Sequence, residues 1–268
     1  MPRAIWSGSI SFGLVNVPVK LYSAISPKDV RFNQLEEGTG ARIRQKRVSA
    51  ETGEEVPYER IVKGYEISPE RYVIITPEEL ESLDPKATRA IDIEDFVELD
   101  QIDPVHYERP YYLVPEKGAV KAYALLLQAM KDSNKVAIAR MVLRTKQYLA
   151  AIRPKGDILC LETMLFADEV VDEKELDGLP GDDVDVSERE LKMARQLIES
   201  LSTDFEPEKY RDEYREQVLA LIEAKAEGQE IVAAAATEEP AQVVDLMAAL
   251  EASLAAARAA KEQEGAGS

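Results

Sequence analysis

The chain has 268 residues, of which 45% are hydrophobic, and its formal net charge at pH 7 is −18. That length suits one large domain or a core with appendages, and no apolar run approaches the ~18 residues that would cross a bilayer. Its one cysteine, Cys160, excludes an internal disulfide, and no basic-then-apolar leader opens the sequence. We therefore expect a protein of the reducing cytoplasm with no membrane partner.

The first predicted element is a β-strand close to the amino terminus. Val15, Val17, Val19 and Leu21 alternate with polar residues, and this period of two is typical of a strand with one buried face. Pro18 removes one ladder hydrogen bond. We therefore expect this strand to lie at a sheet edge or to contain a bulge.

The chain then indicates mostly β-structure up to about residue 115. We predict strands over 42–48, 71–76, 91–99 and 111–114, and a helix that begins at Pro77. A helix over 118–132, a β-hairpin over 136–152 and a strand over 157–166 follow. Together these elements predict a mixed α+β fold that is mainly β.

The carboxy-terminal part is predicted to be helical. Ser187 and Glu190 fit a capping box at the start of one helix, and Pro207 is expected to open a second helix that ends near Gly228. We expect disorder over 229–240 and a last helix over about 240–262. The predicted divisions are a core over 1–167 with an acidic linker over 168–186, a helical arm over 187–228 and an Ala/Glu-rich tail over 229–268.

Charge is distributed unevenly along the chain. Residues 1–50 carry eight Lys and Arg against three Asp and Glu, and residues 119–156 carry eight against one. Residues 51–118 between them are strongly acidic, as is everything after residue 156. Because local potential rather than net charge attracts a polyanion, two basic segments in an acidic chain favour a phosphate-bearing partner.

The basic segments have the spacing of a backbone-binding strand. In an extended chain Arg42, Arg44 and Lys46 would recur every ~6.8 Å on one face, which is comparable to the separation of phosphates along one DNA strand. The other candidate DNA-binding residues are Lys20, Arg47, Arg140, Arg144, Lys146, Arg153 and Lys155. For each strand the alternative is a solvated basic face that the acidic segments balance.

Catalytic chemistry has little support in the sequence. His106 is the only histidine and lies in turn-like sequence, so neither a Cys/His dyad nor a Ser/His/Asp triad is indicated. No Gly-rich phosphate loop is present. The carboxylates of Asp92–Asp95 could serve a metal-dependent nuclease, but a solvated strand face explains them better. We predict a non-enzyme without a cofactor, and the alternative binding function is an acidic scaffold whose basic strands dock a protein partner.

Several segments, in order along nearly the whole chain, resemble the bacterial Ku family of DNA-end-binding proteins. They are Arg3–Tyr22, Gly40–Val48, Gly53–Val56, Lys63–Glu66, Pro110–Leu113, Glu190–Ala194 and Val243–Leu250. The resemblance implies a β-barrel core with an extended DNA-encircling bridge and a helical carboxy-terminal arm. It further implies a homodimeric ring without catalytic activity, located at the bacterial nucleoid. Such a ring threads double-stranded DNA ends without sequence preference and recruits DNA ligase D for non-homologous end joining.

The resemblance also assigns roles to residues. It puts Arg42, Arg44, Lys46 and Arg47 at or near the DNA passage, and it makes the helices over 187–228 the dimer-embracing arm. The candidate ligase contact is the last helix, through Val243, Val244, Leu246, Met247 and Leu250. Some relatives carry a His/Cys set that looks like a zinc site, but the matching positions here are Asn33, Glu36, Ser49 and Thr52. Since zinc requires thiolate or imidazole ligands, we predict no zinc.

Overall fold

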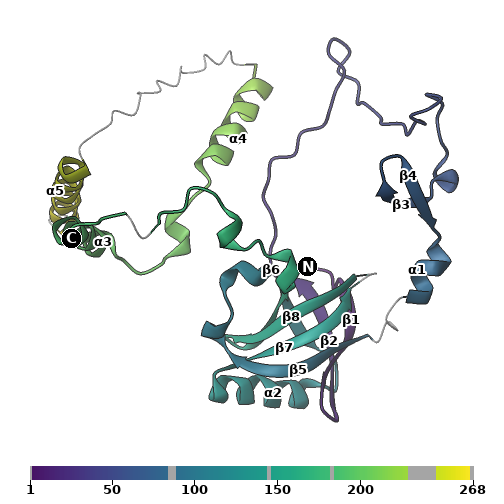
Figure 1. The fold of residues 1–268 in the computed structure, drawn as a ribbon, viewed down its shortest axis with the longest axis horizontal. Coiled ribbons are helices and arrows are strands. Elements are labelled where there is room, and N and C mark those ends of the chain that lie inside the picture. Colours follow the sequence, from purple (N-terminus) through teal and green to yellow (C-terminus); the bar gives the residue numbers. More distant parts are fainter. Residues whose placement is uncertain (1, 84–88, 144–145, 182–183, 229–245, 266–268) are drawn as a thin grey trace. The chain divides into compact units, whose positions relative to one another are not determined.

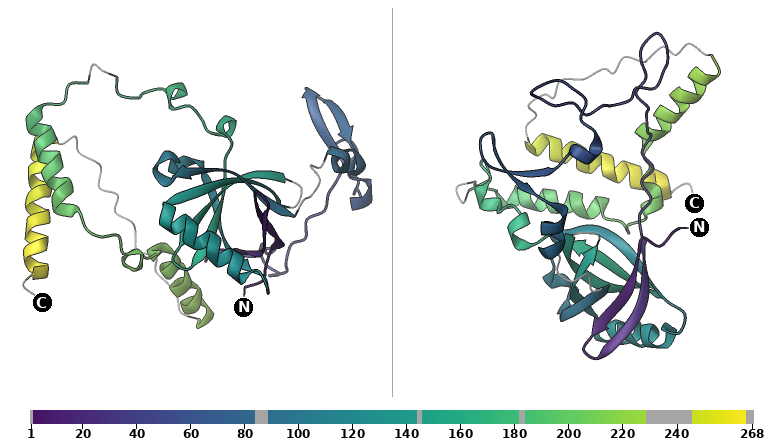
Figure 2. Two further views of the ribbon diagram at one scale, coloured as in Figure 1. Left: turned by 90° about the horizontal axis from the view of Figure 1, so that it is seen from below. Right: turned by 90° about the vertical axis from the view of Figure 1, so that its right-hand side faces the viewer.

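A computed structural model describes residues 2–83, 89–143, 146–181, 184–228 and 246–265. Contacts divide the chain into two units, one of Met1–Lys28 with Phe32–Glu175 and the other of Asp29–Arg31 with Leu176–Ser268. Figures 1 and 2 show both, and each unit is described by itself below. Within the described ranges no helix combines the length and the hydropathy that a bilayer crossing needs.

A closed seven-stranded barrel forms the body of the first unit. Its strands run in the order β1-β2-β6-β9-β8-β7-β5, and every neighbouring pair is antiparallel except β1 and β5, which are parallel. The barrel and the helices around it confirm the predicted mixed α+β, mainly β fold. The strands span Trp6–Phe12 (β1), Val15–Ser23 (β2), Ala90–Glu98 (β5), Tyr107–Pro115 (β6), Lys135–Leu143 (β7), Lys146–Lys155 (β8) and Ile158–Met164 (β9).

The predicted opening strand is the second arm of a hairpin. A turn at Gly13, whose φ of +59° favours glycine, joins β1 to β2. The expected inward positions Val17, Val19 and Leu21 are fully buried, whereas Val15 beside the turn is half-exposed. The alternation therefore identified the buried face of β2 correctly, apart from its first residue.

The expectation that Pro18 marks an edge or a bulge is wrong. β2 is a strand of the closed barrel wall and has a neighbour on each side, β1 and β6. Pro18 lies in regular register opposite Ser9. The ladder to β6 starts only at Val19, opposite Pro115, and the Pro18 carbonyl accepts the Glu116 N–H at 3.0 Å. Since the missing donor faces the place where β6 ends, the proline removes no ladder hydrogen bond.

Gly8 lies where β1 meets the start of β5. An added Cβ would stand 2.2 Å from the Arg89 carbonyl oxygen and 2.2 Å from a ring carbon of Trp6. Trp6 is half-buried against the barrel core, and the Arg89 carbonyl accepts the Ser9 N–H at 2.8 Å. Both neighbours are therefore fixed, so this position has room only for glycine.

Helix α2, Val120–Ser133, closes one end of the barrel (Figures 1 and 2). It confirms the helix predicted over 118–132. It follows the end of β6 and precedes the start of β7. Its Tyr123 hydroxyl donates to the Leu113 carbonyl at 2.6 Å and accepts the Leu159 N–H at 2.7 Å. Leu113 and Leu159 are paired across β6 and β9, so one side chain of α2 holds the end of that ladder together.

The segment between β2 and β5, residues 24–89, is called the bridge below. It contains the hairpin of β3, Lys63–Ser68, with β4, Arg71–Ile75, followed by α1, Pro77–Leu83. The predicted strand over 42–48 is wrong, because only isolated bridge pairs join Leu35 to Arg42 and Val48 to Glu55. The apolar residues of that stretch have no second layer to pack against and remain exposed, so the alternation does not produce a sheet.

The second unit contains three helices, α3 (Glu188–Leu201), α4 (Glu213–Ala226) and α5 (Leu246–Gly265). The capping box at α3 is confirmed: the Ser187 hydroxyl accepts the Glu190 N–H and the Glu190 carboxylate accepts the Ser187 N–H. The expected helix start at Pro207 is wrong. Pro207 opens only a short 3-10 turn, and α4 begins after Asp212, whose carboxylate accepts the Arg215 N–H at 2.9 Å.

Helices α3 and α5 pack side by side (Figure 1). Leu254 of α5 is buried, and the Arg189 guanidinium lies 3.4 Å from the Glu251 carboxylate across the pair. Helix α5 does not cover every apolar residue of α3, because Leu191, Ile198 and Leu201 are exposed. The expected disorder over 229–240 and the start of the last helix lie outside the described residues.

Short 3-10 turns connect the remaining elements. They span Tyr58–Arg60, Leu99–Gln101, Pro104–His106, Ala167–Glu169, Glu173–Glu175 and Pro207–Lys209. The turn at Pro104–His106 contains the only histidine, and His106 Nδ1 lies 3.4 Å from the Leu165 carbonyl oxygen. This contact joins the start of β6 to the end of β9, which is a structural role.

Candidate nucleic-acid interface

Four cations of the bridge lie within one exposed stretch. The Arg42 guanidinium donates to the Asn33 side-chain oxygen, and the Arg47 guanidinium lies 5.2 Å from the centre of the Tyr58 ring. Lys46 Nζ is 2.6 Å from the Glu55 carboxylate, while Arg44 has no side-chain partner among the described residues. Exposed ion pairs contribute only about 0–1 kcal/mol, so a phosphate can replace Glu55 beside Lys46 at little cost.

The positions matching the zinc ligands of some relatives lie in two turns of the bridge. Asn33 accepts from Arg42, and Glu36 accepts the Thr39 hydroxyl at 2.6 Å. The Ser49 hydroxyl accepts the Thr52 N–H at 3.4 Å. Hydrogen bonds therefore hold both turns. In the part of the chain that the structure describes, no group of three or more His, Cys, Asp or Glu side chains could hold a metal ion, and this includes Asp92–Asp95.

Carboxylates pair with most of the barrel cations that the sequence singled out. Arg140 is 3.3 Å from Glu94, Lys146 is 3.5 Å from Glu169 and Lys20 is 4.0 Å from Glu116. All three pairs are exposed. Two strands of opposite charge, β5 and β7, therefore neutralise each other where the sequence alone showed a basic hairpin.

The structure does not bring the barrel candidates to one place. Lys146 begins β8 and Lys155 ends it, so the two are about 30 Å apart at ~3.3 Å per residue. Lys20, Arg153 and Lys155 lie toward the end that α2 closes, and Lys146 lies at the opposite end. Arg144 lies outside the described residues. A single DNA-binding face on the barrel can contain only part of this set.

Arg153 and Glu162 form a partly buried pair on neighbouring strands. The Arg153 guanidinium reaches one Glu162 oxygen from two nitrogens, at 3.0 and 2.6 Å, and Glu162 is 8% exposed. The neighbouring Tyr107 hydroxyl is buried and has no hydrogen-bond partner among the described residues, and its burial, together with the Glu162 charge, raises its pKa. These contacts give Arg153 a structural role, and its role in DNA binding stays a prediction.

Several further cations of the bridge escaped the sequence reasoning. Arg60, Lys63 and Arg71 are exposed and have no carboxylate partner among the described residues. The two on the hairpin lie at opposite ends of it, since Lys63 pairs with Ile75 and Arg71 with Ser68. Residues 51–118 are net acidic, and that sum concealed them. The bridge as a whole is also slightly acidic, with 11 Lys and Arg against 13 Asp and Glu, so only the exposure and the partners of each side chain reveal these cations.

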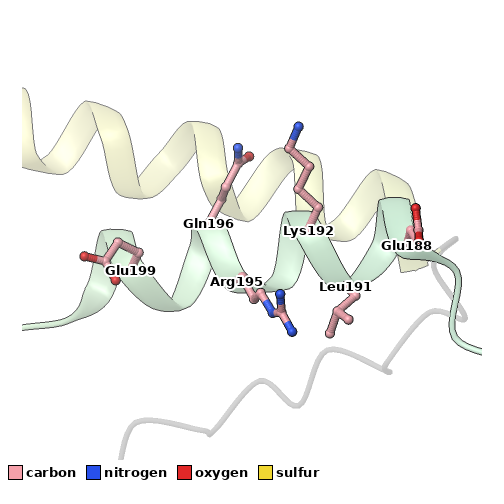
Figure 3. A pocket seen from close by; sticks show the side chains of 6 residues that line it. All are labelled: Glu188, Leu191, Lys192, Arg195, Gln196 and Glu199. Carbon is pink, nitrogen blue, oxygen red and sulfur yellow. The ribbon is translucent and has the colours of Figure 1, made fainter.

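The candidate ligase contact is partly described. Met247 and Leu250 are half-buried on α5, which packs along α3. Val243 and Val244 lie outside the described residues, as does the side chain of Leu246. A groove along α3 is lined by Glu188, Leu191, Lys192, Arg195, Gln196 and Glu199. In Figure 3 the side chains of Leu191 and Arg195 point away from the α5 ribbon, so α3 presents a second, uncovered side.

Comparison with known proteins agrees with this architecture. The family described as "Ku: Ku70/Ku80 beta-barrel domain" matches residues 11–193. A protein of Anaeromyxobacter sp. strain K named "Non-homologous end joining protein Ku" is 57% identical over 259 residues, which cover 96% of this chain and 87% of that protein. A protein of Desulfitobacterium hafniense with the same name is 48% identical over 262 residues, covering 97% and 90%. Because the family model matches most of the length of the chain, which contains a closed barrel and the bridge, the chain belongs to the Ku family.

Proposed function

We propose that this protein forms a homodimeric ring that binds double-stranded DNA ends without sequence preference. In this proposal the ring recruits DNA ligase D for non-homologous end joining, the process for which its relatives are named. The observation that carries the proposal is the bridge. It leaves the barrel after β2, returns at β5 and exposes cations along its length, among them Arg44, Lys63 and Arg71.

Cations on an extended segment can follow a duplex backbone but cannot read its sequence. Arginine and lysine side chains neutralise phosphates and release counterions, and log K falls by about 0.9 per neutralised phosphate for each log unit of salt. The acidic remainder of the chain repels duplex from other surfaces. Sequence-independent binding that depends steeply on salt is the expected result.

In this proposal a second copy of the chain buries apolar surface that is exposed in one copy. Phe32, Tyr58 and Tyr65 of the bridge are each at least 70% exposed. The hairpin of β3 and β4 has only two strands, and an isolated two-stranded hairpin is marginally stable at best. In the second unit Phe205 and Tyr210 stack on each other while both remain exposed. Each unit thus supplies apolar surface that dimerisation can bury.

Topology supplies the preference for ends. Because a protein that contacts only the backbone has no base contacts with which to recognise an end, a closed ring provides that selectivity by admitting DNA only where the duplex stops. The test compares a linear duplex with a covalently closed circle of the same sequence. We expect tight, salt-sensitive binding to the linear form and weak binding to the circle, and equal affinity for both would exclude the ring.

The contribution of the bridge is tested by charge reversal. Arg44→Glu should weaken binding to the linear duplex and flatten the salt dependence, since Arg44 has no protein partner to lose. Lys121→Glu, on the exposed side of α2, is the matched control because it makes the same charge change away from the bridge. Equal effects of the two variants would remove Arg44 from the DNA-binding surface. Ligase recruitment is tested separately by comparing ligase D binding to the full chain and to its Leu250→Asp variant.

A further inference from the structure

The open end of the barrel contains a cavity that the proposed function does not use. It has a volume of about 240 Å³ and is lined by Ile5, Ser23, Arg109, Tyr111, Leu143 and Tyr148. Ile5 immediately precedes β1, and the others come from the end of β2, the first part and middle of β6, the end of β7 and the start of β8. That end is opposite the one closed by α2, and open ends of β-barrels are among the preferred places for ligand sites.

The cavity presents hydrogen-bond donors that have no partner in the protein. Tyr111 is 94% buried, lines the cavity and makes no hydrogen bond through its hydroxyl to a described residue. The Arg109 guanidinium and the Tyr148 hydroxyl are likewise unpaired among the described residues. By contrast, the Ser23 hydroxyl already donates to the Ile25 carbonyl at 2.8 Å. Among the described residues the only buried side-chain polar atom without a partner is the Tyr107 hydroxyl, so the unpaired Tyr111 hydroxyl is accessible from the cavity and free to donate to a ligand there.

The charge around the cavity favours an anion. Arg109 lines it, and the Lys146 ammonium lies 5.2 Å from the centre of the Tyr148 ring. The only carboxylate within ion-pair distance of Lys146 among the described residues is Glu169, at 3.5 Å, and it is exposed. None of the lining residues that the structure describes is acidic.

We propose that this cavity binds the phosphate group of a nucleotide. Guanidinium binds phosphate through paired, charge-assisted hydrogen bonds, and the two tyrosine hydroxyls supply further donors. The volume is below the ~300–1,000 Å³ of drug-sized ligand sites, so it accepts a phosphate with part of its nucleotide. The proposal rests on the proposed function where the phosphate comes from a DNA end, and the same chemistry fits a free mononucleotide.

The experiment uses the full chain and four probes. Blunt duplexes that carry a 5′-phosphate or a 5′-hydroxyl test a DNA end, adenosine monophosphate tests a free nucleotide, and inorganic phosphate tests the anion alone. The variants are Arg109→Gln and Tyr111→Phe, with Lys121→Gln as the control for loss of a distant cation. Tyr111→Phe removes a hydroxyl without a protein partner, so it should leave the urea unfolding midpoint unchanged or slightly higher.

We expect Arg109→Gln to weaken binding of at least one phosphate-bearing probe about tenfold, consistent with loss of a charge-assisted pair. Tyr111→Phe should weaken the same probe by a smaller factor, and Lys121→Gln should not change it. Loss confined to the 5′-phosphorylated duplex identifies a DNA end as the source, and loss confined to adenosine monophosphate or inorganic phosphate identifies a free ligand.

Two results would overturn the proposal. One is no measurable difference between either variant and the wild type with any probe. The other is an equal loss of probe binding in Lys121→Gln, which would show that the loss comes from the change in overall charge. Neither affects the ring, because the comparison of linear and circular DNA is made on the wild-type chain.

Discussion

The Tyr123 hydroxyl accepts the backbone N–H of Leu159 at 2.7 Å while donating to the carbonyl of Leu113. Helix α2 thus supplies a hydrogen bond that the two strands cannot make to each other at their ends. Tyr123→Phe should lower the free energy of unfolding by about 1–3 kcal/mol, because it leaves a buried N–H without a partner. Urea denaturation measures the effect. Tyr111→Phe is the control, and equal stability of Tyr123→Phe and wild type would refute the role.

Gly8→Ala should destabilise the barrel at the seam between β1 and β5. The new methyl would meet a backbone oxygen and the Trp6 ring at 2.2 Å, and neither can move without losing packing or the bond to Ser9. Overpacking of this kind typically costs about 1–3 kcal/mol. Gly64→Ala in β3 is the matched control, since its Cβ would lie 3.4 Å from Tyr72, an ordinary contact. Thermal unfolding of both variants should separate them, and a midpoint for Gly8→Ala as high as that of Gly64→Ala contradicts the account.

Cys160 should report barrel unfolding. It is the only cysteine, it is buried in β9, and its burial raises the pKa of the thiol although the Arg153 charge lowers it in part. A raised pKa keeps the thiol neutral to higher pH, and the thiolate is the reactive form. Native protein at pH 7–8 should therefore react slowly with a thiol reagent and rapidly once urea exposes the residue. Fast stoichiometric labelling without denaturant would show that the strand opens locally.

The capping box of α3 should make that helix sensitive to acid. Hydrogen bonds from the Ser187 hydroxyl and N–H hold the pKa of Glu190 below its ordinary value of 4.5. A carboxyl with a lowered folded pKa stabilises the fold fully above its unfolded pKa and loses that contribution as pH falls through the folded value. Glu190→Gln should therefore reduce helicity by circular dichroism at pH 7, with a difference from wild type that shrinks as the pH falls below the ordinary glutamate pKa of 4.5. A difference independent of pH would assign the effect to packing.

Sequence periodicity predicted the parts of the fold whose residues have a core to face. Val17, Val19 and Leu21 alternate because the barrel interior lies on one side of β2, and α2 follows from the helical spacing of its buried residues. In the stretch over 42–48 it is positive charge that recurs at every second position, at Arg42, Arg44 and Lys46, and its apolar residues Ile43 and Val48 remain exposed, so this pattern predicted a strand where no sheet forms. Pro18 was misjudged for a similar reason, since where a neighbouring strand ends is a property of the whole sheet.

The candidate site was less predictable than the fold. Charge and parity identified Arg42–Arg47 but grouped Lys146 with Lys155, which the length of β8 separates. The pairing of Arg140 with Glu94 depends on strand neighbours that are distant in sequence. The cavity is lined by Arg109, Tyr111 and Tyr148, which come together only because the barrel closes. Their spacing in the sequence therefore could not predict it.

The parallel pairing of Ser9 with Ala90 has a consequence for how the barrel folds. The whole bridge must be looped out before this seam can close, and the entropy of loop closure grows only logarithmically, by ~0.6 kcal/mol for each doubling of length. The bridge can thus lengthen or shorten with little effect on equilibrium stability. A longer bridge instead lowers the folding rate, because contacts between residues distant in sequence form slowly. Until they form, the open seam between β1 and β5 is exposed to aggregation.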